Sequence, residues 1–145
     1  MKNPIVHFEI PVDDVERAKT FYTETFGWKI HKFDMPATSS TGGEPYYGVI
    51  TTEVDENKMA KTPGAINGGL MKRVNPGQPF MNYIQSDNIE ESLEAIKANG
   101  GTIIMPKTEI APHMGWIAAF KDTENNIMGL HQMSPTHKAQ MKEQK

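Results

Sequence analysis

The sequence contains no cysteine. Disulfide bonds and thiolate metal ligands are therefore excluded, and a transition-metal site would have to be built from histidine and carboxylate side chains. No stretch approaches the length of apolar sequence that spans a bilayer, and the first residues, MKNPIVHFEIPVDD, lack the apolar segment of a secretion signal. We therefore expect a cytoplasmic protein without a membrane partner.

An excess of positive charge is also missing. The formal net charge is −3, and the 15 Lys and Arg residues are interspersed among 18 Asp and Glu residues. Since no basic stripe can neutralise a run of phosphates, nucleic acid is not an expected partner. The motifs G-x-S-x-G, G-x-G-x-x-G and H-E-x-x-H and the P-loop lysine motif are absent too. The sequence therefore offers none of the common local signatures of a catalytic or nucleotide-binding site.

A weak internal repeat is what the sequence does contain. Residues 5–30 align without a gap with residues 79–104 after a shift of 74 positions, which places Asp13 on Asp87 and Gly27 on Gly101. Both copies show a strand pattern, an aspartate, an amphipathic run and a glycine before the next strand pattern. We interpret residues 1–133 as a single domain of two modules, 3–75 and 79–133, followed by a polar tail at 134–145.

Hydrophobic periodicity predicts an α+β fold in which each module has the order βαβββ. The spacing D-x-x-E at Asp13 and Glu16, and again at Asp87 and Glu90, predicts a helix N-terminus in each module. The polar segment 34–45, rich in Gly and Pro, predicts a mobile loop or lid. The predicted helices cover residues 13–26 and 87–99, and the predicted strands cover 4–11, 28–33, 46–54, 65–74, 80–85, 102–105, 116–121 and 127–133.

Two βαβββ modules with the segments VHFEIPVDDVERAKTFYTETFGW, GGLMKR and DTENNIMGLHQ resemble the vicinal oxygen chelate superfamily. The superfamily includes glyoxalase I, bleomycin-resistance proteins and extradiol dioxygenases. The three segments are similar to those of the branch related to lactoylglutathione lyase. The resemblance covers residues 3–133. It implies a half-open barrel of two sheets with the helices outside, a concave face that holds a small organic molecule and, in the enzymes, a divalent metal, and a homodimer.

The metal ligands of that superfamily lie on the first and last strands of each module. Carried onto this sequence, their positions fall on His7, Gly69, Met81 and Gly129. Only His7 has a side chain that such metals favour, so a divalent metal is unsupported at three of the four positions and the cofactor is unknown. A replacement site made of His7, Glu9 and His131 would resemble a facial triad, provided that the strand register brings the three side chains together.

Strand alternation places His7 and Glu9 on one face, with Met81 and Tyr83 on the corresponding face of the second module. If the protein is an enzyme, the resemblance implies a proton-transfer lyase or isomerase step with Glu9 as the base and His7, or a metal, as the electrophile. Simpler structural roles are a hydrogen bond from His7 to a neighbour and a pairing of Glu9 with His7 or Arg73. The remaining aromatic residues on strands are expected first of all in the core. The residues predicted to contact the ligand are Gly69, Met71, Met81, Tyr83, Gly129 and His131.

Three functions remain open at this stage. The first is the lyase or isomerase just described. The second is a non-catalytic protein that sequesters a small molecule or antibiotic, as the bleomycin-resistance proteins do, and the weakness of the metal positions favours it. The third is a ring-cleaving dioxygenase, which needs two histidines and one carboxylate around Fe(II).

Overall fold

The computed structural model describes residues 3–138. Its two helices are α1 (Val15–Phe26) and α2 (Ile89–Ala98). Its strands are β1 (Ile5–Val12), β2 (Lys29–Phe33), β3 (Tyr46–Ile50), β4 (Gly68–Lys72), β5 (Met81–Gln85), β6 (Thr102–Glu109), β7 (Trp116–Lys121) and β8 (Ile127–Gln132). The predicted α+β order of two βαβββ modules is confirmed.

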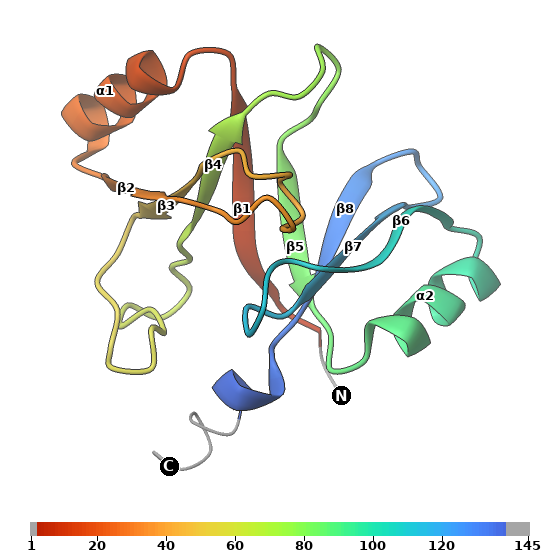
Figure 1. The fold of residues 1–145 in the computed structure, drawn as a ribbon. Coiled ribbons are helices and arrows are strands. Elements are labelled where there is room, and N and C mark those ends of the chain that lie inside the picture. The colour runs from red at the N-terminus through yellow and green to blue at the C-terminus, as the bar shows by residue number, and fades with distance from the viewer. Residues whose placement is uncertain (1–2, 139–145) are drawn as a thin grey trace.

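All eight strands form one open sheet in the order β2-β3-β4-β1-β5-β8-β7-β6. The first strands of the two modules, β1 and β5, pair antiparallel in the middle of the sheet, with His7 opposite Tyr83 and Glu9 opposite Met81. Each first strand also pairs in parallel with the last strand of its own module, β1 with β4 and β5 with β8. The modules therefore join within one chain (Figure 1).

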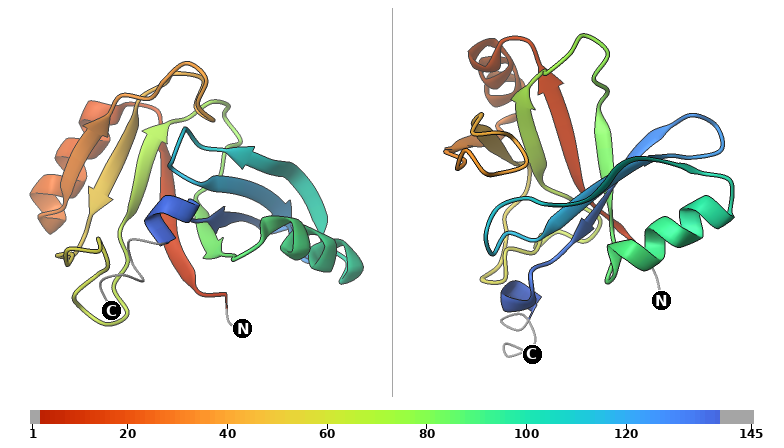
Figure 2. Two further views of the ribbon diagram at one scale, coloured as in Figure 1. Left: turned by 60° about the horizontal axis from the view of Figure 1, so that its bottom comes forward. Right: turned by 45° about the vertical axis from the view of Figure 1, so that its right-hand side comes forward.

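One hydrophobic cluster lies in each module, on the side of the sheet that the helices cover. The first contains Phe8 and Leu70, and the second contains Ile89 and Leu130. Complete burial of a side chain as large as Leu70 or Ile89 contributes about 1.5–3 kcal/mol each to stability. The two helices lie at opposite ends of the curved sheet (Figure 2). Because Phe8 faces the first cluster, its neighbours His7 and Glu9 face the opposite side, which we call the inner face.

Both helices begin two residues later than predicted, and each is capped one residue later than predicted. The Asp14 side chain accepts a hydrogen bond from the backbone N–H of Arg17 at 3.0 Å, and Asn88 caps α2 in the same way. The predicted cap Asp13 instead pairs with Arg73 at 3.0 Å, and the predicted cap Asp87 pairs with Lys138 at 3.4 Å. The observed caps, Asp14 and Asn88, are separated by the same 74 positions as the two copies of the sequence repeat. The helix-ending role of Gly27 is confirmed by its left-handed φ of 71°.

Several strand boundaries also differ from the predictions. The strand predicted at 46–54 ends at Ile50, because Asn67 Oδ1 accepts the backbone N–H groups of Thr51 and Thr52 at 2.7 and 3.1 Å in place of a strand ladder. For the same reason β4 begins only at Gly68. In the second module, β6 continues to Glu109, so the loop predicted from residue 107 starts three residues later.

The predicted lid at 34–45 reaches the second module. The backbone N–H of Ser40 donates a hydrogen bond to the carbonyl oxygen of Ile110 at 2.9 Å, and Ser39 is buried. This segment runs from β2 toward the loop between β6 and β7 (Figure 1). The two modules are thus in contact through these loops as well as through β1 and β5.

The described part of the predicted polar tail contains a short helical segment. Residues 135–138 form a helical turn, Ser134 is buried, and its Oγ accepts the backbone N–H of His137 at 3.2 Å. His137 is half-buried, whereas His31 and His113 are exposed. Residues 139–145 lie outside the described residues. Within residues 3–138, no helix combines the length and the apolar character needed to cross a membrane.

Candidate active site

Glu9 is at the centre of a hydrogen-bonded cluster on the inner face. Its Oε2 atom accepts a hydrogen bond from the hydroxyl of Tyr46 on β3 at 3.1 Å and another from the hydroxyl of Tyr83 on β5 at 3.3 Å. Among the described residues, no group donates to the second oxygen, Oε1. The two tyrosines therefore fix the orientation of the carboxylate and leave one oxygen for another molecule.

His7 extends the cluster by one step. Its Nε2 atom lies 2.9 Å from the hydroxyl of Tyr46, and its ring makes an edge contact with Tyr83 at a centroid distance of 5.5 Å. Because the Tyr46 hydroxyl donates its hydrogen to Glu9, it accepts from His7, which requires the tautomer with hydrogen on Nε2. The order of donation is then His7 to Tyr46 to Glu9.

Burial changes the acidity of each member of the cluster. It raises the pKa of Glu9, and the hydrogen bonds from Tyr46 and Tyr83 oppose that rise. Burial also lowers the pKa of His7 to about 4, with a smaller contribution from His131. The pKa of both tyrosines is raised, first by burial and then by the charge of Glu9. At neutral pH His7 is therefore uncharged, both hydroxyls keep their protons, and Glu9 holds a proton more readily than an exposed carboxylate does.

Two glycines leave the space that the tyrosine rings occupy. A Cβ atom at Gly69 on β4 would overlap the hydroxyl and ring of Tyr46, and a Cβ atom at Gly129 on β8 would overlap the ring of Tyr83. Gly69 is the strand partner of Glu9, and Gly129 is the strand partner of Tyr83. The tyrosine rings thus fill space that a side chain at either glycine would need.

The other residues predicted for ligand contact surround this cluster. Met71 follows Gly69 by two residues on β4, and Met81 is the strand partner of Glu9, so both belong to the inner face, and both are half-buried. His131 on β8 is half-buried as well, and the neighbouring His137 adds to the effect of burial in lowering its pKa. His131 influences the pKa of His7 in turn. The predicted residues are thus assembled on one face.

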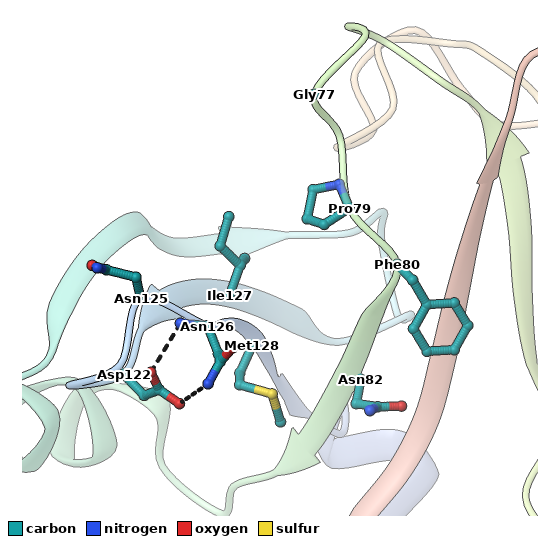
Figure 3. A pocket seen from close by; sticks show the side chains of 9 residues that line it. All are labelled: Gly77, Pro79, Phe80, Asn82, Asp122, Asn125, Asn126, Ile127 and Met128. Carbon is teal, nitrogen blue, oxygen red and sulfur yellow. Dashed lines mark hydrogen bonds between the residues drawn. The ribbon is translucent and has the colours of Figure 1, made fainter.

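A cavity of about 480 Å³ lies away from this cluster. Its walls include Phe80, Asn82 and Met128, on the helix side of β5 and β8, together with Asp122 (Figure 3). The Oδ1 and Oδ2 atoms of Asp122 accept hydrogen bonds from the backbone and side chain of Asn126 within the turn between β7 and β8. Because those acceptors stabilise the turn and the cavity contains none of the predicted site residues, we place the candidate site at Glu9.

One protein family and one related protein match this sequence. The family described as "Bleomycin resistance protein-like N-terminal" matches residues 4–39. A protein of Didymella fabae described as a "Glyoxylase-like domain-containing protein" is 33% identical over 122 residues, which are 81% of this chain and 84% of that protein.

The chain belongs to the vicinal oxygen chelate superfamily, among its glyoxalase-like members.

Solved structures show the same superfamily fold at much lower identity. A hypothetical protein of Bacillus halodurans C-125 has a TM-score of 0.64 and 15% identity, with 92% of this chain and 96% of that chain covered. The methylmalonyl-CoA epimerase of Mycobacterium tuberculosis has a TM-score of 0.64 and 13% identity, with 93% and 91% covered. At this identity the comparison establishes the vicinal oxygen chelate fold alone.

The donors expected of a metal-dependent vicinal oxygen chelate enzyme do not come together here. Within residues 3–138, no three His, Asp or Glu side chains are grouped so that they could hold a metal ion. His7, Glu9 and His131 are therefore not arranged as the facial triad considered from the sequence, because Nε2 of His7 is directed to Tyr46 and Oε2 of Glu9 to both tyrosines. The residues present do not fit a resident divalent ion.

The sequence prediction missed one residue of the site in this vicinal oxygen chelate protein. That residue is Tyr46, which was expected in the core. Its neighbours Tyr47 and Val49 pack with the first hydrophobic cluster, and alternation then directs Tyr46 and Gly48 to the inner face. The available signal was the pair of glycines on the adjacent strand, which indicated room for a large side chain. The predicted pairing of Glu9 with Arg73 is wrong, because Arg73 binds Asp13 and the carbonyl oxygens of Pro11 and Gln78.

Proposed function

We propose that this glyoxalase-like protein binds a small uncharged organic molecule on the inner face and catalyses proton transfer at a carbon next to a carbonyl group, as a lyase or isomerase. The observation that carries the proposal is the state of Glu9, whose Oε2 is held by two tyrosine hydroxyls while its Oε1 is free of protein donors within the described residues. A raised pKa suits such a carboxylate to accept and return a proton near neutral pH.

The proposed step conserves its atoms and charge. Oε1 of Glu9 takes the proton from the carbon, the electrons of the C–H bond form a C=C bond, and the carbonyl electrons move onto oxygen. Once Glu9 is protonated, it attracts the hydroxyl hydrogens of Tyr46 and Tyr83 less strongly, and these become available to the developing oxyanion. Both hydroxyls keep their protons at neutral pH because the pKa of each is raised. Return of the proton from Glu9 to the same carbon regenerates the substrate and exchanges its hydrogen with solvent. In a hydroxyketone, the hydroxyl proton moves to the enolate oxygen, and Glu9 then protonates the adjacent carbon to give the isomeric carbonyl compound.

The charge around Glu9 supports an uncharged substrate. No Lys or Arg within residues 3–138 makes an ion pair or hydrogen bond with Glu9, and Arg73 is engaged by Asp13. A carboxylate on the reacting part of a substrate would meet no compensating cation in a half-buried site. Methylmalonyl-CoA, named for the epimerases of the same fold, is therefore a poorer candidate than a neutral hydroxyketone.

A second candidate function is sequestration without chemistry. The match of residues 4–39 to the bleomycin-resistance-like family supports it, and so does the half-buried, largely apolar character of Met71 and Met81 beside the cluster. In that case Glu9 and its tyrosines only hydrogen-bond the bound molecule. Such a protein gains thermal stability from its ligand and turns nothing over.

Solvent exchange distinguishes the two functions. Dihydroxyacetone and methylmalonyl-CoA are incubated with the protein in deuterium oxide, and loss of the C–H signal is followed by proton NMR. We expect exchange of dihydroxyacetone with the unmodified protein and with Glu24→Gln, which changes an exposed glutamate of α1, and no exchange with Glu9→Gln. Unchanged exchange in Glu9→Gln contradicts the proposed base, and stabilisation by dihydroxyacetone without exchange favours sequestration.

A further inference from the structure

The two metal-ligand positions that the resemblance places on β4 and β8 are both glycines here, Gly69 and Gly129, and neither glycine borders an empty space. The hydroxyl of Tyr46 lies where a side chain at Gly69 would begin, and the ring of Tyr83 lies where a side chain at Gly129 would begin. A carboxylate cannot be added at either position unless the corresponding tyrosine moves. The loss of the ligands and the placement of the tyrosines are therefore one structural feature.

The two tyrosines come from different modules and meet at a single atom. Tyr46 reaches across Gly69 to Glu9 on the neighbouring strand, and Tyr83 approaches the same carboxylate from the second module. Both hydroxyls donate to Oε2. The two hydroxyls thus orient Glu9 and partly offset the effect of burial on its charge.

The surviving histidine is also engaged. Nε2 of His7 forms a 2.9 Å hydrogen bond with the hydroxyl of Tyr46, and the ring lies against Tyr83. Coordination through Nε2 would require Tyr46 to leave, which would remove a donor from Glu9 at the same time. Displacement by a metal would thus break two of the hydrogen bonds that hold the cluster together.

We propose that this chain has exchanged the superfamily's metal centre for a hydrogen-bonded centre made of protein groups alone, in which Tyr46 and Tyr83 fill the two glycine positions and orient Glu9. The inference concerns the same site as the proposed function, and it deepens that function to a metal-independent one. Its own support is the packing at Gly69 and Gly129, so the two can fail separately.

Elemental analysis of the untagged protein tests the inference. The protein is stripped with EDTA, dialysed against zinc, manganese or nickel chloride, desalted and analysed beside His7→Ala and the control His31→Ala, which removes an exposed histidine of β2. We expect the same substoichiometric metal content in all three proteins. One metal ion per chain in the unmodified protein and in His31→Ala, lost in His7→Ala, would overturn the inference.

A second measurement does not depend on the folding of His7→Ala. The thermal midpoint of the unmodified protein is compared in EDTA and in each of the three metal chlorides. An unchanged midpoint supports the inference, and an increase that EDTA reverses overturns it. Failure to exchange dihydroxyacetone both with and without added metal would defeat the proposed function alone, whereas exchange that occurs only with added metal would defeat the inference alone.

Discussion

The hydroxyl of Tyr46 occupies the space into which any side chain at Gly69 would extend. From that position it donates a hydrogen bond to Glu9 and contacts Nε2 of His7. A backbone position without a side chain on β4 thus determines how a carboxylate on β1 is held. The acid–base character proposed for Glu9 depends on this relationship, and the relationship can be tested by substitution.

Substitution of Gly69 by alanine should destabilise the protein because Tyr46 is in the way. Overpacking of this kind costs about 1–3 kcal/mol. The same Gly69→Ala change in a Tyr46→Ala background should cost much less, since the overlapping ring is gone. Urea unfolding of the four proteins of this cycle measures the difference. Gly77→Ala is the matched control, because a Cβ atom there meets only an ordinary contact with Asn75, and it should be nearly neutral. An equal cost of Gly69→Ala in both backgrounds would show that Tyr46 does not fill this space.

The stability of the protein should depend on pH through His7. Its pKa is lowered from 6.5 to about 4, so the unfolded chain binds a proton between these values while the folded chain does not. The contribution of uncharged His7 to the free energy of unfolding is therefore fully present above pH 6.5 and is lost as the pH decreases toward 4. In His7→Gln the free energy of unfolding should decrease less between pH 6.5 and 4, by up to about 3 kcal/mol. Urea unfolding across the pH range measures this difference.

Glu9 should shift the same profile in the opposite direction. Its pKa is raised above 4.5, so ionisation in the folded protein costs stability as the pH rises through that raised value. Glu9→Gln should remove this loss. A profile that responds in the same way to His7→Gln and Glu9→Gln would contradict the burial-driven pKa changes.

The contact between the loops of the two modules predicts a cross-link. The hydrogen bond from Ser40 to Ile110 brings these residues close enough for a disulfide, and the chain has no cysteine of its own. Oxidised Ser40→Cys/Ile110→Cys should unfold at a higher temperature, by an amount that corresponds to about 2–4 kcal/mol, and reduction should reverse the gain. Ser40→Cys/Lys107→Cys is the control, because Lys107 pairs with Glu90 of α2. Failure of the first pair to form a disulfide would mean that the loops are apart in solution.

Local patterns were sufficient for the architecture. The repeat predicted two βαβββ modules, and alternation on β1 placed His7 and Glu9 together because a strand's period of two is fixed by its backbone. The helix caps were predicted one residue early, since Asp13 is drawn to Arg73, which is 60 residues away in sequence. The local spacing of residues cannot predict a contact between residues that are so far apart in the sequence.

The partners of Glu9 could not be predicted from the sequence for the same reason. Tyr46 becomes a partner of Glu9 only because the strand order is β3-β4-β1, so that the Tyr46 side chain on β3 reaches across β4 to Glu9 on β1. Tyr83 was predicted to contact a ligand because its position in the second module corresponds to the face of His7 and Glu9, yet its bond to Glu9 required the antiparallel register of β1 and β5. Cross-strand geometry, rather than residue type, made Tyr46 and Tyr83 hydrogen-bond donors to Glu9.

The central claim is that Tyr46 and Tyr83 hold Glu9 as an acid–base group, and a titration of Glu9 tests it most directly. The Glu9 side-chain carboxyl carbon is followed by NMR in protein labelled with ¹³C at the glutamate side chains, with Glu9→Gln to assign the signal. We predict a pKa above 4.5 in the unmodified protein and a further rise in Tyr46→Phe and Tyr83→Phe, because each hydroxyl lowers the pKa of Glu9 against the larger effect of burial. A pKa at or below 4.5, or one that neither substitution changes, would contradict the account.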